Sequence, residues 1–152
     1  MQASFLFRFR VYKFMGDGWI LLFDFAPGEN IVNFAEAFSL LFENKIQRLI
    51  KNHIDNPPDI LGLTFGVDRG TLVKLNIMGR EEYVGWPINV ASRLEKARNG
   101  DKTPQYKLLV TKPVYQVIKQ YLKNYPVKHV TRKLKNVQVK PFHCVSIRVK
   151  EL

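Results

Sequence analysis

A short segment near the middle of the chain carries the side chains with the clearest chemical potential. Asn89 and Arg93 are four positions apart, so on a helix they lie on one face, one turn apart. Pro87 suits the first turn of such a helix, and apolar residues recur at helical spacing, which predicts a helix here. An amide and a guanidinium on one face, beside Gly85, suit the binding of a sugar and a phosphate. The same pair is also common on a solvated helix surface, so both interpretations stay open.

Two further candidates lie on a predicted hairpin near the N-terminus. Asp17 stands between Gly16 and Gly18, where glycine lets the backbone turn tightly and lets an anion approach closely. A carboxylate there can bind Mg²⁺, which takes one or two carboxylates and completes its shell with water and phosphate oxygens. An Asp-Gly pair is also what a tight turn prefers. Lys13, on the strand entering the turn, can donate to a ring acceptor of a nucleobase or simply line a solvated strand edge.

Positive charge is concentrated in the last third of the chain. From residue 96 onward there are 14 Lys and Arg against 2 Asp and Glu, in a chain of net charge +11. Such a lobe attracts polyanions, and Lys135 with its neighbours Arg132 and Lys133 can meet a triphosphate or remain solvated. The aromatic residues here are not interleaved as in an RNA-binding sheet, so neither DNA nor RNA is expected as a partner. Nucleic-acid binding through this lobe remains a rival hypothesis.

Composition predicts a single folded domain over residues 1–152, because 46% of the residues are hydrophobic. The single cysteine excludes an intramolecular disulfide, and no Cys/His metal spacing is present, which fits a cytoplasmic setting. No apolar run approaches the roughly 18 residues of a membrane span, and no signal peptide is evident. Walker, G-x-G-x-x-G and Ser-His-Asp arrangements are absent from the sequence.

The periodicity of apolar residues predicts the elements that position these side chains. They are a first hairpin (Ser4–Phe14 and Trp19–Phe25), a long helix (Asn30–His53), a second hairpin around Asp68-Arg69-Gly70 (Ile60–Val67 and Thr71–Met78), the helix with Asn89 and Arg93, a strand (Lys107–Val110), a short helix (Pro113–Tyr121) and two closing strands (Val127–Leu134 and Val139–Val149). Helices placed between hairpins predict an α+β fold with one mainly antiparallel sheet and helices mostly on one face.

These segments, taken in order, resemble the catalytic domain of the class III nucleotidyl cyclases (adenylate and guanylate cyclases). The resemblance rests on VYKFMGDGWILLF, FGVDRGTLVKLNIMG, EEYVGWPINVASRLEKA, KLLVTKPVY and, more loosely, RKLKNVQVKPFHCVSI, and runs from about Val11 to Ile147. It implies a ferredoxin-like, palm-type fold and a head-to-tail homodimer. It also implies an enzyme that converts a nucleoside triphosphate to a 3′,5′-cyclic nucleotide and pyrophosphate, using two Mg²⁺ or Mn²⁺ ions.

The resemblance assigns roles to matching positions. Asp17 matches the second of the family's two metal-binding aspartates. Asn89 matches the ribose-orienting asparagine, and Arg93 matches the arginine that stabilises the transition state, where a planar fork can serve two phosphate oxygens. Lys135 is a looser match to a phosphate-contacting lysine, because Asn136 replaces the usual glycine.

The choice of base stays open between two interpretations. Lys13 matches the base-selecting lysine of adenylate cyclases, which favours ATP. Glu82 lies three residues before Gly85, where purine cyclases usually carry Asp, Thr or Cys. The compact segment EEYVGWPINVASRL is similar to cyclases of bacterial anti-phage signalling that make a cyclic pyrimidine nucleotide, which favours a substrate such as UTP and a second-messenger role in antiviral defence.

The chain departs from the family pattern before its first hairpin. Only sixteen residues precede Asp17, and residues 1–10 contain no acidic side chain. The family's first metal-binding aspartate lies on an opening strand well upstream of this point. We therefore expect the opening strand and first helices to be missing, and the chain to supply half of each metal site. The alternative is a catalytically incompetent cyclase-homology module that acts as a regulatory or dimerising domain.

Overall fold

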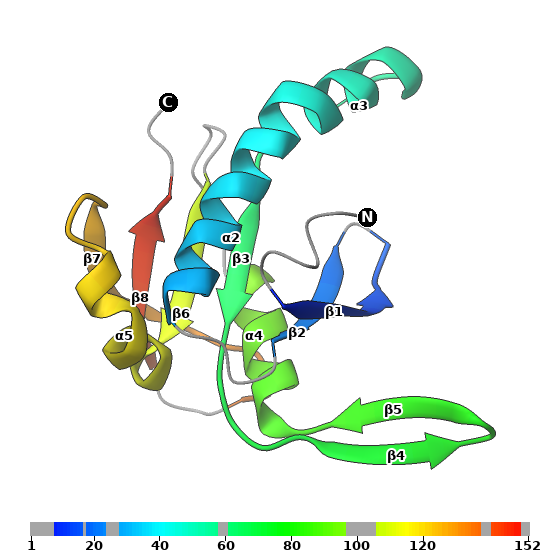
Figure 1. Ribbon diagram of the computed structural model, residues 1–152, viewed down its shortest axis with the longest axis vertical. Helices are drawn as coiled ribbons and strands as arrows, with labels where there is room; N and C mark the ends of the chain where they lie inside the picture. The colour runs from blue at the N-terminus through cyan, green and yellow to red at the C-terminus, as the bar shows by residue number, and fades with distance from the viewer. Residues whose placement is uncertain are drawn as a thin grey trace.

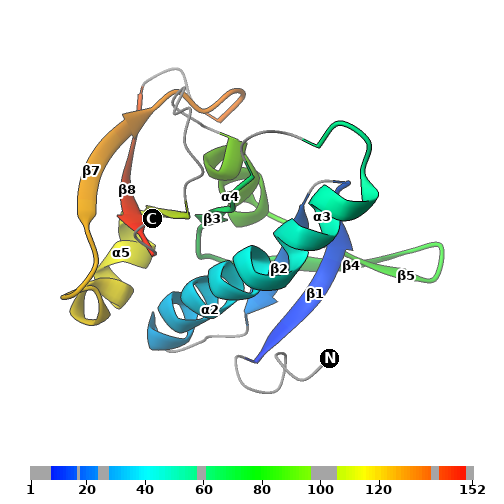
Figure 2. The same ribbon diagram turned by 90° about the horizontal axis from the view of Figure 1, so that it is seen from above.

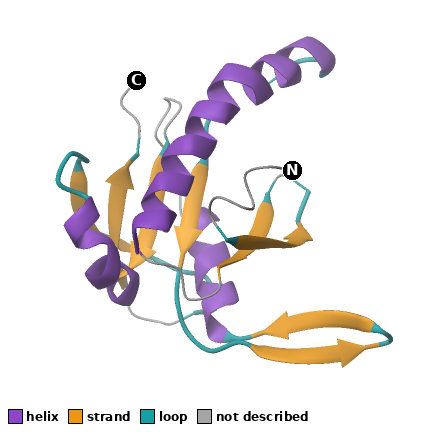
Figure 3. Ribbon diagram, viewed as in Figure 1, coloured by secondary structure: helices purple, strands orange, loops and turns teal. Residues whose placement is uncertain are grey.

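The computed structural model describes residues 8–16, 18–23, 28–57, 61–96, 106–137 and 141–149. Figures 1 and 3 show the elements in these ranges. In chain order they are β1 (Phe9–Phe14), β2 (Trp19–Phe23), α2 (Gly28–Leu41), a π-helical turn (Phe42–Ile46), α3 (Gln47–His53), β3 (Thr64–Val67), β4 (Val73–Ile77), β5 (Arg80–Val84), α4 (Trp86–Lys96), β6 (Lys107–Thr111), α5 (Lys112–Ile118), a 3₁₀ turn (Lys119–Tyr121), β7 (Val127–Arg132) and β8 (Phe142–Arg148).

A four-stranded mixed sheet, in the order β3–β6–β8–β7, forms the centre of the fold. Strands β3 and β6 are parallel, whereas the β6–β8 and β8–β7 pairings are antiparallel. The β1–β2 and β4–β5 hairpins form separate two-stranded sheets. The α+β class and the mainly antiparallel central sheet are therefore confirmed, although the described strands divide into three sheets instead of one.

Helices cover both faces of this central sheet (Figure 2). Side chains alternate between the faces along β6: Leu108 and Val110 belong to the buried cluster that contains α2 and α5, while Leu109 belongs to the cluster that contains α4. Helices α2 and α5 thus share one face of the sheet, and α4 packs on the other. No helix in the described ranges is long and apolar enough to cross a membrane.

Most of the elements predicted from periodicity are present. The first hairpin, the long helix and the closing strands are confirmed within the described residues, while residues 4–7 and 24–25 of the predicted hairpin lie outside them. The long helix extends from Gly28 to His53 but contains the π-helical turn at Phe42–Ile46. The π-helical turn was not predicted, because such single turns occur inside helices and the apolar spacing on either side of this one remains helical.

The second predicted hairpin is wrong in its pairing. The segment from Thr64 to Val67 joins the central sheet beside β6, and Val73–Ile77 pairs with Arg80–Val84 instead. The turn of the real hairpin is therefore at Met78 and Gly79, whose φ angles are +52° and +77°. Two positive φ values are what a tight hairpin turn requires. A methionine in this conformation is uncommon, so residue preference pointed to the Asp-Arg-Gly sequence instead.

Helix α4 packs directly on strand β3 at Gly66. A Cβ at this position would lie 2.0 Å from the carbonyl oxygen of Ala91 and 2.7 Å from the amide nitrogen of Glu95, so only glycine admits the helix so closely. Val90 and Leu94, one turn apart on the same helix, are fully buried with 0% exposure. This contact fixes the rotation of α4 and hence the direction of its remaining faces.

A cluster of phenylalanines fixes the β1–β2 hairpin to α2 and β3. The Phe34 ring of α2 lies 5.0 Å from Phe9 and 5.4 Å from Phe23, measured between ring centroids. On its other side Phe34 lies 6.2 Å from Phe65 of β3. Edge-to-face aromatic contacts of this kind bury much apolar area and have a preferred geometry. The hairpin is therefore held in place relative to the strand on which α4 packs.

Candidate functional site

The helix predicted around Asn89 and Arg93 is α4. Because Val90 and Leu94 face the core, Asn89 and Arg93 occupy the adjoining stripe, where Asn89 is exposed and Arg93 is half-buried. The Nε atom of Arg93 is buried and makes no hydrogen bond within the part of the chain that the structure describes. Buried donors normally have a partner, so the Arg93 Nε–H is one of the exceptions among the described residues.

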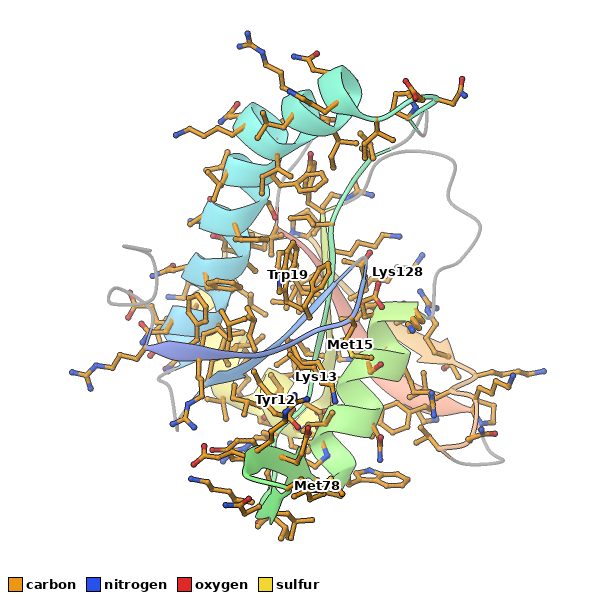
Figure 4. The ribbon with its side chains drawn as sticks, turned by 90° about the vertical axis from the view of Figure 1, so that its right-hand side faces the viewer. Tyr12, Lys13, Met15, Trp19, Met78 and Lys128 are labelled. Carbon is orange, nitrogen blue, oxygen red and sulfur yellow. The ribbon has the colours of Figure 1, made fainter. Side chains whose placement is uncertain are left out.

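Lys13 and Glu82 come from different hairpins and meet in the structure. The Lys13 Nζ atom lies 3.7 Å from Glu82 Oε2, and the two side chains are 51% and 32% exposed. In Figure 4 Lys13 lies above the β4–β5 hairpin, whose tip carries Met78. An ion pair this exposed adds little stability. It instead presents a donor and an acceptor side by side to solvent or to a ligand.

The carboxyl group of Glu82 is held in its ionised form. Its pKa is lowered chiefly because the Tyr12 hydroxyl donates a hydrogen bond to it, and further by the positive charge of Lys13. Bonds to the charged form of a carboxyl favour that form. Lys13 was predicted from the residues and Glu82 from the family resemblance, but their contact was not predicted, because nothing local relates positions this far apart.

Tyr12 contacts the same carboxylate as Lys13, and this contact was not predicted. Its hydroxyl donates to Glu82 and accepts a hydrogen bond of 2.9 Å from the backbone N–H of Tyr83. The two tyrosine rings lie edge to face, with centroids 5.2 Å apart and planes at 83°. The alternation of residues along β1 suggested only an ordinary strand, and no signal in the sequence marks Tyr12 for this contact.

Gly85 joins the strand that carries Glu82 to the helix that carries Asn89 and Arg93. It is the single residue between β5 and α4. A Cβ at this position would lie 2.8 Å from the carbonyl oxygen of Thr71, so the chain passes too close to its neighbour for any other residue to fit without movement. Gly85 therefore joins strand β5, which carries Glu82, directly to helix α4, which carries Asn89 and Arg93.

The turn that carries Lys135 lies beside α4. Lys135 is exposed, but Leu134 immediately before it is 3% exposed and belongs to the buried cluster that contains Val90 and Leu94. The turn is closed by a 3.3 Å hydrogen bond from the Val137 N–H to the Leu134 carbonyl. The turn with Lys135 is therefore on the side of the sheet that α4 covers. Its contact with a phosphate stays a prediction.

The predicted metal ligand, Asp17, lies outside the described residues. The turn on either side of it is described: the Met15 N–H donates to the Gly18 carbonyl at 2.8 Å, and Gly16 has a φ of +86°, which favours glycine. Within the described ranges no three His, Cys, Asp or Glu side chains group together as a metal site would require. The described residues do not by themselves form a Mg²⁺ or Mn²⁺ site. The binding of two metal ions therefore stays a prediction.

The fold is the one found in the catalytic domains of adenylyl and guanylyl cyclases, as the resemblance to class III cyclases implied. The structure matches the adenylyl cyclase CyaB from P. aeruginosa with a TM-score of 0.66 at 18% identity, covering 96% of this chain and 74% of CyaB. It matches the guanylyl cyclase Cya2 with a TM-score of 0.65 at 17% identity, covering 95% of this chain and 72% of Cya2.

A third match is the catalytic core of a rhodopsin-guanylyl cyclase with converted specificity, in complex with ATPαS. Its TM-score is 0.55 at 18% identity, and the match covers 97% of this chain and 76% of that one. No protein-family model and no curated protein matches the sequence. At these identities the likeness establishes the fold, and the chemistry has to be argued from the side chains.

Proposed function

We propose that this protein is a nucleotidyl cyclase, which converts a nucleoside triphosphate into a 3′,5′-cyclic mononucleotide and pyrophosphate. The observation that carries the proposal is the meeting of Lys13 and Glu82, 3.7 Å apart, at an exposed site in a fold that adenylyl and guanylyl cyclases share. The side chains that family resemblance assigns to the base thus lie together. The complex of one structural neighbour with ATPαS gives further support, since it places a nucleotide on this fold.

In this proposal the ribose 3′-hydroxyl loses its proton to water as its oxygen attacks the α-phosphorus of the same molecule, and pyrophosphate leaves as the bond to its bridging oxygen breaks. Positioning and charge stabilisation account for most of such catalysis. The Arg93 guanidinium stabilises the negative charge that develops on the phosphoryl oxygens. The Asn89 amide orients the ribose, and Lys135 binds the polyphosphate. At the base, the Lys13 ammonium donates and the Glu82 carboxylate accepts.

The proposal includes divalent cations that bind together with the triphosphate. Two Mg²⁺ or Mn²⁺ ions, when bound, supply neutralisation of the phosphate charge. Asp17 is the side chain we propose as a ligand, because a carboxylate oxygen is the donor that such hard cations prefer. The roles proposed for Asn89, Arg93 and Lys135 follow the family resemblance, and the hydrogen-bonding groups of these side chains are suited to them.

We also propose that the protein acts as a head-to-tail homodimer. Both hairpins expose large apolar side chains, including Phe14 at 59% and Trp19 at 52% on the first and Met78 at 98% on the second. The β4–β5 hairpin extends away from the rest of the fold (Figure 1). Apolar surfaces of this kind mark interaction sites. They equally favour the second candidate function, a dimerising module without catalysis, which turnover would exclude.

Two substrate classes compete, and substrate consumption separates them. ATP is favoured by Lys13, and a pyrimidine triphosphate such as UTP by the likeness of EEYVGWPINVASRL to anti-phage cyclases. We expect the full-length protein, with Mn²⁺ or Mg²⁺, to consume one of ATP, GTP, CTP and UTP faster than the others. Binding of these nucleotides with no consumption of any would support the dimerising module instead.

Replacement of Asn89 by alanine is expected to lower kcat about 100-fold while KM changes less than about threefold, because orientation of the ribose matters more in the transition state than in binding. Asn89 is exposed, so its loss should leave the fold unchanged. Steady-state kinetics with the preferred nucleotide measures the split. The matched control is Gln116→Ala, which removes an exposed amide from α5 on the opposite face of the sheet. An equal change of kcat in both variants would show that Asn89 does not orient the ribose.

A further inference from the structure

We propose that Tyr12 is a positioning residue for base recognition: its hydroxyl holds the Glu82 carboxylate beside Lys13, so that the nucleobase meets a fixed acceptor and donor. The inference rests on the proposed function, since it concerns the site at which the base would bind. It assigns to Tyr12 an action through Glu82 and no contact with the reacting atoms.

A β-bulge directs Tyr12 toward the second hairpin. In the β1–β2 ladder Val11 lies opposite Leu21 and Lys13 lies opposite Ile20, so Tyr12 has no partner of its own. An extra residue of this kind bends the strand and turns its side chain away from the regular alternation. In Figure 4 Tyr12 lies next to Lys13, above the β4–β5 hairpin. The bulge thus brings two successive side chains of β1 to the same carboxylate.

The contacts leave one oxygen of Glu82 for a ligand. Both the Tyr12 hydroxyl and the Lys13 ammonium approach Oε2, and neither of these contacts uses Oε1. A carboxylate oxygen has two lone pairs, so Oε1 remains able to accept from an N–H group of a base. The Lys13 ammonium carries three N–H donors, and those not directed at Glu82 can bond a neighbouring ring or carbonyl acceptor.

The Tyr12 hydroxyl is itself held by the strand that carries Glu82. It accepts from the Tyr83 N–H, so its proton is directed to the carboxylate. Arg10 adds a second link between the same strands, donating to the Tyr83 hydroxyl at 2.6 Å. Without such links, a glutamate on an exposed two-stranded hairpin would sample several rotamers. Ordering it only on binding costs affinity, and a carboxylate ordered beforehand avoids that cost.

The first test is the titration of Glu82 in the full-length protein, followed by NMR of its side-chain carboxyl carbon. Tyr12→Phe removes only the hydroxyl. The Glu82 pKa should rise toward its ordinary value, though not fully, because Lys13 of β1 and Arg80 of its own hairpin still favour the charged form. The matched control, Tyr83→Phe, removes a hydroxyl that accepts from Arg10 and does not contact Glu82. In this variant the Glu82 pKa should equal that of the unmodified protein. An unchanged pKa in Tyr12→Phe would overturn the inference.

The second test is calorimetric binding of ATP, GTP, CTP and UTP to the same proteins. In Tyr12→Phe the preference for the best nucleotide over the others should fall about tenfold, as expected when a bond to a charged group is lost. Tyr83→Phe should keep the preference. A raised pKa with an unchanged preference would overturn the specificity role while leaving the cyclase proposal standing. If the unmodified protein binds none of the four, the proposed function is wrong and the inference falls with it.

Discussion

Replacement of Arg93 by alanine is expected to lower the rate of cyclic nucleotide formation about 1,000-fold, since one arginine directed at a transferring phosphoryl group is worth that much or more. The melting temperature should change little, because alanine is the best helix former and Arg93 lies beside, not within, the buried stripe of α4. Steady-state turnover with the preferred nucleotide, together with thermal unfolding, gives both quantities.

Two further variants sharpen this result. Arg93→Lys keeps the positive charge but loses the planar fork, so it should recover only a minor part of the rate. Arg48→Ala, the matched control, removes an exposed arginine from α3 and should retain full turnover. Turnover that survives in Arg93→Ala would place the stabilisation of the phosphoryl group elsewhere in the protein.

The second large effect is expected on stability. Gly66→Ala would place a methyl group 2.0 Å from the Ala91 carbonyl oxygen, and because both partners are backbone, no side chain can rotate away. The helix α4 must then move off strand β3, separating Val90 and Leu94 from the core. We expect the free energy of unfolding to fall by about 3 kcal/mol or more, at the upper end of overpacking effects. Urea denaturation measures this change.

Gly18→Ala provides the matched control for stability. A Cβ at Gly18 would meet no atom within 4 Å. The same chemical change there should alter the free energy of unfolding by less than about 1 kcal/mol, mostly through the unfolded chain. Equal losses in the two variants would mean that the close contact between α4 and β3 does not hold the helix.

The Gly66 and Arg93 variants test two different properties of helix α4, its position on the sheet and the side chain that it presents. Gly66 fixes where α4 lies, and Arg93 projects from the stripe next to the buried one. Because only Gly85 separates α4 from β5, the position of the helix also bears on Glu82 and on the hairpin that carries it. A shift of α4 is therefore expected to affect both the phosphate side and the base side of the proposed site.

Local patterns predicted the elements whose partners are close in sequence. The spacing of apolar residues predicted α4 and placed Asn89 and Arg93 one turn apart, and the Gly16-Asp17-Gly18 sequence predicted the first hairpin. Each of these depends on neighbours within a few positions, which is where helix periodicity and turn preferences apply. Family resemblance added the roles, which periodicity cannot supply.

Features that depend on distant contacts were missed. Strand β3 pairs with β6 and not with β4, and the tight turn falls on Met78 and Gly79 because strand pairing outweighs the preference of methionine. The bulge at Tyr12 was not predicted, and the contact it allows with Glu82 joins two hairpins that are far apart in the sequence. The link between Tyr12 and Glu82 is therefore information that only the three-dimensional structure contains.

The most direct test of the proposed cyclase activity is the identity of the product. The full-length protein is incubated with its preferred nucleoside triphosphate and Mn²⁺ or Mg²⁺. The products are separated by liquid chromatography and identified and quantified by mass spectrometry. A nucleotidyl cyclase releases the 3′,5′-cyclic mononucleotide and pyrophosphate in equal amounts. Release of a nucleoside diphosphate with inorganic phosphate, or no product from a nucleotide that binds, would contradict the assignment.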